Sequence, residues 1–262
     1  MKDRTAGEKG FTLIEMAIVL VVIGLILGAV SIGKDLQRNA EYDTVKQKFI
    51  DQWATAYNIY YQRVGVVLGD SEVAPRLMVA GSAYAAPVGT PISGGNMAVV
   101  PSPGAICQGL APVGITLATP SATLFAATMH TYFDQTGIRM PPGRAEGSED
   151  RFAYLDSNGN PQEIQVCFRW NAPATPEGAG NVMLIAGLTP DLARALDQMI
   201  DGKPDAQEGM FRQLGVVNGV AGGPGISWNT NNTQVFGAGA GSGTNLDEDQ
   251  VVTVTAVYKM NQ

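Results

Sequence analysis

The chain has 262 residues, of which 45% are hydrophobic, only 16% are charged and one is a histidine. This length is sufficient for a substantial hydrophobic core in one or two domains. The formal net charge of −7 leaves no domain-wide basic surface of the kind that nucleic-acid-binding proteins use. The single histidine excludes most catalytic triads and metal sites that depend on imidazole groups.

The strongest signal is an apolar stretch over residues 11–33, which contains one charged residue, Glu15. About 20 such residues in an α-helix rise ~30 Å, the thickness of the hydrocarbon core of a bilayer. The ten residues before it are polar with a slight basic excess, which favours a cytoplasmic N terminus. A secretory signal peptide would need a shorter apolar core and a clear cleavage site. A plain membrane anchor leaves unexplained the costly carboxylate of Glu15.

Residues 9–15, with the sequence KGFTLIE, resemble the class III signal of type IV pilins and of the pseudopilins of type II secretion. The resemblance implies that a membrane peptidase cleaves after Gly10 and that Phe11 becomes the N-methylated mature N terminus. It also implies that Glu15 pairs with the Phe11 amine of a neighbouring subunit and sets the subunit register during assembly. The alternative for Glu15 is a tolerated charge that snorkels to the membrane interface.

No proline interrupts residues 11–64, and the helical periodicity continues after the apolar stretch. One apolar stripe recurs every three or four residues, at Tyr42, Val45, Phe49, Trp53, Ala56, Tyr60 and Val64. The sequence therefore predicts a continuous helix over residues 11–64. Its half at 11–33 is the transmembrane and filament-core half, and its amphipathic half at 34–64 packs on a globular domain. Gly65 is expected to stop the helix.

Residues 65–262 are expected to form a pilin-like head, following a cleaved leader at residues 1–10. The resemblance and the patterns together predict an α+β fold, in which the long N-terminal helix packs on an antiparallel β-sheet with long Gly-rich loops. Strands or hairpins are predicted at residues 151–170 and 251–258, short helices at 121–135 and 187–202, and irregular surface segments at 65–120 and 215–245. Thr189 is the expected N-cap and Gly202 the expected stop of the helix at 187–202.

Two groups of polar residues have two possible interpretations each, and the single histidine is assigned no chemistry. The spacing of Asp156, Asn158 and Asn160 resembles the start of a calcium loop, but the later positions do not fit, so a turn is preferred and no cofactor is otherwise expected. The carboxylates of Asp197, Asp201 and Asp205 are interpreted as a solvated helix end in preference to a metal site. His130 is expected to be a surface or packing residue.

Cys107 and Cys167 are the only cysteines. If the head is exported, it lies in an oxidising compartment, so a disulfide between the two is predicted. Two unpaired buried thiols are the alternative.

The sequence contains no nucleophile elbow, phosphate-binding loop or Cys/His cluster, so it offers no catalytic residue and an anchored enzyme is least favoured. The resemblance implies a structural subunit of a type IV pilus or related pseudopilus. Such a prepilin is inserted once in the bacterial inner membrane and processed by the prepilin peptidase/N-methyltransferase. It then joins other pilin subunits at the inner-membrane assembly platform, in a periplasmic or extracellular filament.

The length of the chain and its Gly-rich segments favour a minor subunit over a bulk subunit. The alternative is a specialised tip, adhesin or DNA-uptake minor pilin. Arg139 and Arg144 form the only suggestive basic loop pair, and the acidic balance of the chain does not favour nucleic acid.

Overall fold

A computed structural model describes residues 11–70, 104–109, 112, 115–116, 128–156, 159–171, 175–217, 227–228 and 253–260. The expected leader at 1–10 and most of the irregular segments expected at 65–120 and 215–245 lie outside these residues. The chain divides into two compact units, Met1–Glu41 and Tyr42–Gln262.

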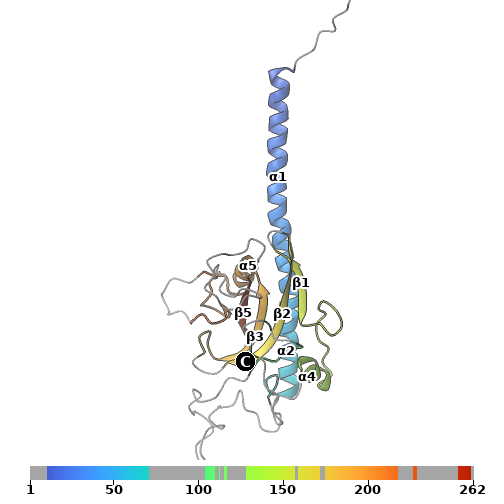
Figure 1. Cartoon of the computed structure of the whole chain (residues 1–262), viewed down its shortest axis with the longest axis vertical. Helices are drawn as coiled ribbons and strands as arrows, with labels where there is room; N and C mark the ends of the chain where they lie inside the picture. Colours follow the sequence, from blue (N-terminus) through green and yellow to red (C-terminus); the bar gives the residue numbers. More distant parts are fainter. Residues whose placement is uncertain are drawn as a thin grey trace, which may run out of the picture. The chain divides into compact units, whose positions relative to one another are not determined.

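The first unit consists of the start of helix α1 (Leu13–Val45), drawn in blue in Figure 1. Its segment Leu13–Val30 is long and apolar enough to cross a membrane, and none of it is buried. Nothing lies within 4 Å of the positions that a Cβ would take at Gly24, Gly28 and Gly33. The predicted N-terminal apolar helix is therefore confirmed, and no described contact within the chain requires glycine at these three positions.

In the second unit the helix continues, but one turn of it is not α-helical. The π-helical turn η1 (Lys46–Ile50) follows α1, and α2 (Asp51–Val64) follows η1. The backbone N–H of Asp51 donates to the carbonyl of Lys46, and the Lys46 ammonium lies 2.8 Å from the Asp51 carboxylate. A π-turn inserts one residue into the helical repeat, which brings residues i and i+5 together. The predicted continuous helix therefore runs from Leu13 to Val64, with one π-helical turn that sequence periodicity does not register.

Helix α2 ends at Val64, and Gly65 adopts the left-handed conformation with φ of 82°. Glycine adopts this conformation without the steric cost that a Cβ imposes. The predicted apolar stripe is buried from Tyr42 to Tyr60, and Ile50 and Tyr57 are buried with it. The stripe prediction is therefore confirmed.

The head contains a five-stranded antiparallel sheet with the order β1-β2-β3-β5-β4. The strands are β1 (Arg151–Leu155), β2 (Pro161–Asn171), β3 (Gly180–Leu188), β4 (Phe211–Gln213) and β5 (Val254–Lys259). The α+β fold class is confirmed. Strand β3 was not predicted, because both of its faces are buried and its residues are almost continuously apolar instead of alternating. Strand β4 is only three residues long.

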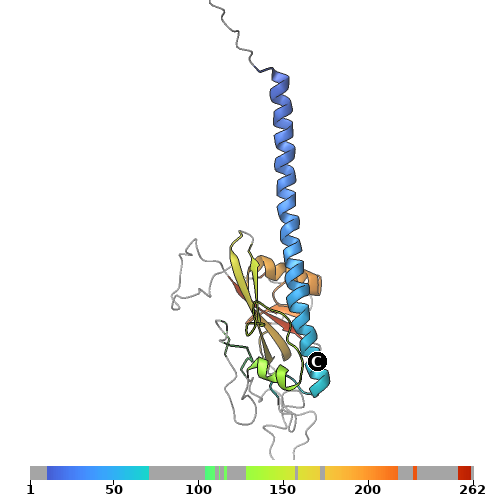
Figure 2. The same cartoon turned by 90° about the vertical axis from the view of Figure 1, so that its right-hand side faces the viewer.

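Helix α2 lies across one face of the sheet (Figure 1 and Figure 2). Its aromatic rings pack on Phe168 of β2, with centroid distances of 4.9 Å to Tyr57 and 6.1 Å to Trp53. Phe49 packs on Phe152 of β1 at 5.3 Å. Because side chains alternate along a strand, these contacts use one face of the sheet and leave the other face to a second cluster.

Residues 104–109, which the sequence analysis placed at the surface, lie along the edge of the sheet beside β2 and contribute side chains to the hydrophobic clusters on both faces. Ala105, Ile106 and Cys107 are instead buried, and Ile106 exchanges two backbone hydrogen bonds with Phe168, of 2.7 and 2.9 Å. Beside this bridge, Cys107 and Cys167 form a disulfide whose Cα atoms are 4.5 Å apart. The surface prediction was wrong because this segment pairs with a strand about 60 residues later in the chain, and local sequence patterns do not encode such a distant pairing.

Two short helices complete the head. Helix α4 (Met129–Gln135) occupies the end of the predicted helix at 121–135, whose earlier residues lie outside the described part. Helix α5 (Pro190–Asp201) begins at Thr189, whose hydroxyl accepts a hydrogen bond from the N–H of Leu192, and it ends at Gly202 with φ of 78°. Both predicted caps of α5 are therefore confirmed.

We expect removal of the disulfide by Cys107→Ser or Cys167→Ser to lower the free energy of unfolding by about 2–4 kcal/mol. The bond restricts the unfolded chain, and its loss frees a long loop. Denaturant unfolding of the full chain in detergent measures the change. The double variant should cost no more than either single variant, and a reductant should have the same effect on the wild type. An additive loss in the double variant would contradict a role through the shared bond.

Candidate functional site

The start of α1 contains a reciprocal pair of contacts between Thr12 and Glu15. The backbone N–H and the hydroxyl of Thr12 both donate to Glu15 Oε2, at 2.8 and 2.9 Å. The N–H of Glu15 lies 3.3 Å from the Thr12 hydroxyl oxygen. This is a capping box, which satisfies backbone N–H groups that the first turn of a helix leaves free. The sequence analysis missed it, although the T-x-x-E spacing before an apolar run is its signal.

The capping box holds the Glu15 carboxylate at the positive end of the helix, near the backbone of Phe11 and Thr12. The side chain of Glu15 is exposed, and that of Phe11 is 81% exposed. An anion is therefore fixed at the tip of an apolar helix. Among the described residues, no basic side chain is bound to it. Such an anion is available to a cation on another molecule. Gly10 lies outside the described residues.

Residues 5–31 match the family model described as the prokaryotic N-terminal methylation motif. Residues 5–31 therefore carry a class III signal of the type IV pilin-like kind, and the apolar helix within and after them is long enough to anchor the chain in a membrane. This motif implies processing by a prepilin peptidase. No curated protein sequence and no solved structure matches the chain.

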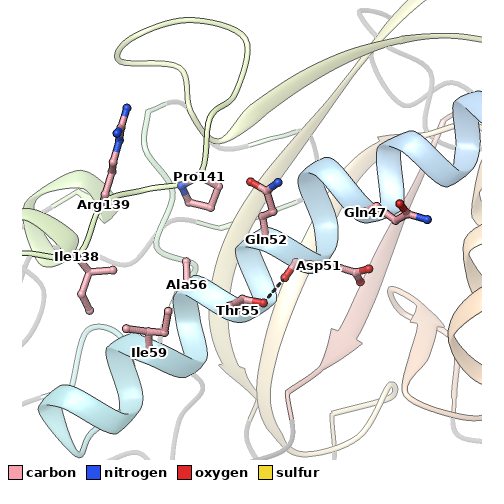
Figure 3. A pocket seen from close by; sticks show the side chains of 9 residues that line it. All are labelled: Gln47, Asp51, Gln52, Thr55, Ala56, Ile59, Ile138, Arg139 and Pro141. Carbon is pink, nitrogen blue, oxygen red and sulfur yellow. Dashed lines mark hydrogen bonds between the residues drawn. The ribbon is translucent and has the colours of Figure 1, made fainter.

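The head has an open groove of about 380 Å³ between the helix and the loop after α4 (Figure 3). Its lining residues are Gln47, Asp51, Gln52, Thr55, Ala56, Ile59, Ile138, Arg139 and Pro141. The Asp51 carboxylate is bound by Lys46, and the Thr55 hydroxyl donates to the Asp51 carbonyl at 2.7 Å. The groove therefore presents no pair of a nucleophile and a base among its lining residues.

Arg139 and Arg144 have different surroundings in the head. Arg144 forms an ion pair with Glu163, which also binds Arg151 at 2.9 Å. Arg139 is exposed and lines the groove. His130 lies 2.9 Å from the Asp134 carboxylate one turn later, and both side chains are exposed. These contacts are those of a solvated surface.

The predicted turn at Asp156 is closed by the carboxylate itself. Asp156 is buried, and its Oδ1 accepts a hydrogen bond of 2.8 Å from the N–H of Asn160. Its Oδ2 lies 3.3 Å from the amide nitrogen of Asn160 and 3.4 Å from that of Gln162. Amide N–H groups thus occupy the oxygens that a calcium ion would need. Asn158 lies outside the described residues, and the expectation of no cofactor remains a prediction.

The interpretation of Asp197 as part of a solvated helix end was wrong. Asp197 and Asp205 are buried, and Asp197 Oδ2 accepts a 3.0 Å hydrogen bond from the indole of Trp228. The pKa of Asp197 is raised to about 8, mainly by burial and also by the charges of Asp201 and Asp205, while the Trp228 hydrogen bond opposes the shift. No local pattern indicates this burial, because the partner Trp228 lies 31 residues away along the chain.

The three carboxylates near the end of α5 do not converge on one point. Asp201 accepts from the N–H of Phe211 at 2.7 Å, and Asp205 accepts from the N–H groups of Gln207 and Glu208. Within the described residues, no three Asp, Glu, His or Cys side chains are arranged to hold a metal ion.

We expect Thr12→Ala to weaken the first turn of α1 by about 1 kcal/mol, because both the hydroxyl donor and the side-chain cap are lost. Thr12→Ser keeps both and is the matched control. Amide hydrogen exchange of residues 12–16 in the full chain in detergent measures the change. Exchange should be several-fold faster in Thr12→Ala than in the control, and equal exchange would contradict a capping role.

Proposed function

We propose that the chain is a structural subunit of a type IV pilus or a related pseudopilus. The observation that carries the proposal is the class III signal joined to an exposed apolar helix, whose first turn holds the carboxylate of Glu15. A helix that is apolar on all sides is stable in lipid or among other apolar helices. The same segment is thus suited to serve as membrane anchor and then as filament core.

The carboxylate of Glu15 gives this assembly a register. A lone charge within lipid is costly, and an opposite charge at short range in a low dielectric offsets much of that cost. Cleavage after Gly10 would leave a positively charged amine on Phe11. A new subunit would then enter the filament at the one axial position where its Phe11 amine meets Glu15 of its neighbour, or the reverse. The capping box supports this role because it holds the carboxylate at the end of the helix where the amine forms.

The N terminus of the precursor would remain in the cytoplasm while the head is exported, and the disulfide of the head is consistent with an oxidising compartment. The length of the chain supports a minor subunit within this class. A tip adhesin or DNA-uptake subunit is the alternative, and the net charge of −7 does not support contact with DNA.

The peptidase is expected to cleave after Gly10. Intact-mass and N-terminal fragment spectra of the chain from cells with an active prepilin peptidase should show N-methylated Phe11 as the first residue. Cells without the peptidase are the control and should retain residues 1–10. Retention of the leader in both strains would refute processing of this chain.

We expect Glu15→Ala to leave cleavage largely unchanged but to reduce incorporation into filaments at least tenfold, because the amine of the neighbour loses its partner. Immunoblots of sheared filaments, normalised to the membrane pool, measure incorporation. Glu146→Ala removes an exposed carboxylate of the head and is the matched control. Equal incorporation of Glu15→Ala and wild type would sink the assembly role.

Immunogold labelling of the same filaments separates the subtypes. Uniform label along the filament indicates a major subunit, whereas sparse or terminal label indicates a minor one.

A further inference from the structure

The carboxylate of Asp197 is among the most deeply buried acids of the described head. Its relative exposure is 0%, and no basic side chain among the described residues forms an ion pair with it. Its Oδ2 accepts the indole N–H of Trp228, whereas Oδ1 is buried without a hydrogen-bond partner. An unpartnered oxygen is far more costly on a buried anion than on a neutral acid.

The charged groups around Asp197 do not compensate it. On α5, Asp201 adds negative charge, and Arg194 is paired with Asp191. In the turn that follows, Asp205 adds a second negative charge. Lys203 is 54% exposed and is bound to Asp205 and Glu208.

The strands that pack on α5 do not supply a cation either. On β4, the guanidinium of Arg212 donates to the carbonyls of Gly209 and Glu177. On β5, Tyr258 is neutral, and burial raises its pKa with a further rise from Asp51 and Asp201. Partial burial lowers the pKa of Lys259, and repulsion from Arg212 lowers it as well. The proton is therefore the counterion that this site can hold.

Trp228 is the partner that depends on this proton. Its side chain is fully buried, and its ring packs on Phe211 at a centroid distance of 5.4 Å. Its indole N–H donates a hydrogen bond to Asp197. The site thus joins α5, β4 and residues 227–228 through one indole and one carboxyl group.

We propose that Asp197 and Trp228 form a pH-gated latch of the head, in which neutral Asp197 keeps the Trp228 indole in the core and deprotonation releases it. Proton loss is a simple acid–base step, in which Oδ1 gives its proton to water. The carboxylate that forms then faces Asp201 and Asp205, and it gains by reaching solvent. This movement requires the indole to leave its contact with Phe211.

The direction of the pH effect follows from the pKa of Asp197, which lies near 8 in the folded head against an ordinary value of 3.8. Between these two values the folded head keeps the proton and the unfolded chain does not. The folding equilibrium therefore weakens as pH rises through this window, by up to tenfold per pH unit for one proton. Below the window both states are protonated, and above it both are ionised.

The test follows tryptophan emission and near-UV circular dichroism of the full chain in detergent from pH 6 to 9.5. We expect a red shift and a loss of near-UV signal as the pH rises across this range. Asp197→Asn keeps an acceptor for the indole but cannot ionise, so its signals should stay constant over this range. Trp228→Phe should lose the emission change, because Trp228 is the tryptophan that is hydrogen-bonded to Asp197.

The N-terminal amine also titrates near pH 8, but its signal would persist in Asp197→Asn. If that variant fails to fold, infrared spectra of the wild type should still show a protonated carboxyl band at pH 6 that disappears by pH 9.5. A transition that is equal in wild type and Asp197→Asn would overturn the latch, as would no transition in the wild type. A midpoint that moves with added Ca²⁺ would overturn it too, because a metal and not a proton would then be the counterion.

Discussion

The packing of the head depends on Phe168 of β2, which contacts both the amphipathic helix and the segment at residues 104–109. Its ring stacks on Tyr57 and contacts Trp53, so it fixes the amphipathic helix to one face of the sheet. Its backbone pairs with Ile106, so the same residue also fixes the edge segment that carries Cys107 of the disulfide with Cys167. A buried aromatic ring contributes roughly 2–3 kcal/mol through burial alone. The helix and the edge segment therefore meet at one position of β2.

The long helix is built for two different solvents. From Tyr42 onward its apolar residues are buried against the head, which leaves a polar face in water. Before Glu41 the apolar side chains are exposed on all sides, and no described part of the chain covers them. Only lipid or other helices can cover such a surface. The apolar surface therefore has to be covered by something other than the described part of the chain, and the proposed filament would cover it.

Local signals in the sequence predicted much of this fold, and contacts between distant residues account for the rest. The stripe on the helix, the caps Thr189 and Gly202 and the hairpin at β1 and β2 each follow from residues within one or two turns. The burial of both faces of β3 and the burial of Asp197 depend on tertiary partners, which periodicity does not encode. The π-turn is local, but periodicity does not register its one extra residue. At the candidate site, the class III signal was readable because its spacing is local. The capping role of Thr12 was equally local and was overlooked.

Two buried carboxylates of the head show how the same group can be permanent or conditional. Glu177 binds Arg169 at 2.6 Å, and Asn171 and the N–H of Gly215 also donate to it, so both of its oxygens are satisfied. Asp197 has one donor and no cation, so only one of its oxygens is satisfied. A fully paired carboxylate keeps its partners as long as the fold persists, because removing any one of them leaves a buried charge exposed to its full desolvation cost. The burial of a half-paired carboxylate is favourable only while the group is neutral. The connection between β2 and β3 is therefore fixed by charge pairing, whereas the attachment of Trp228 to α5 depends on a proton.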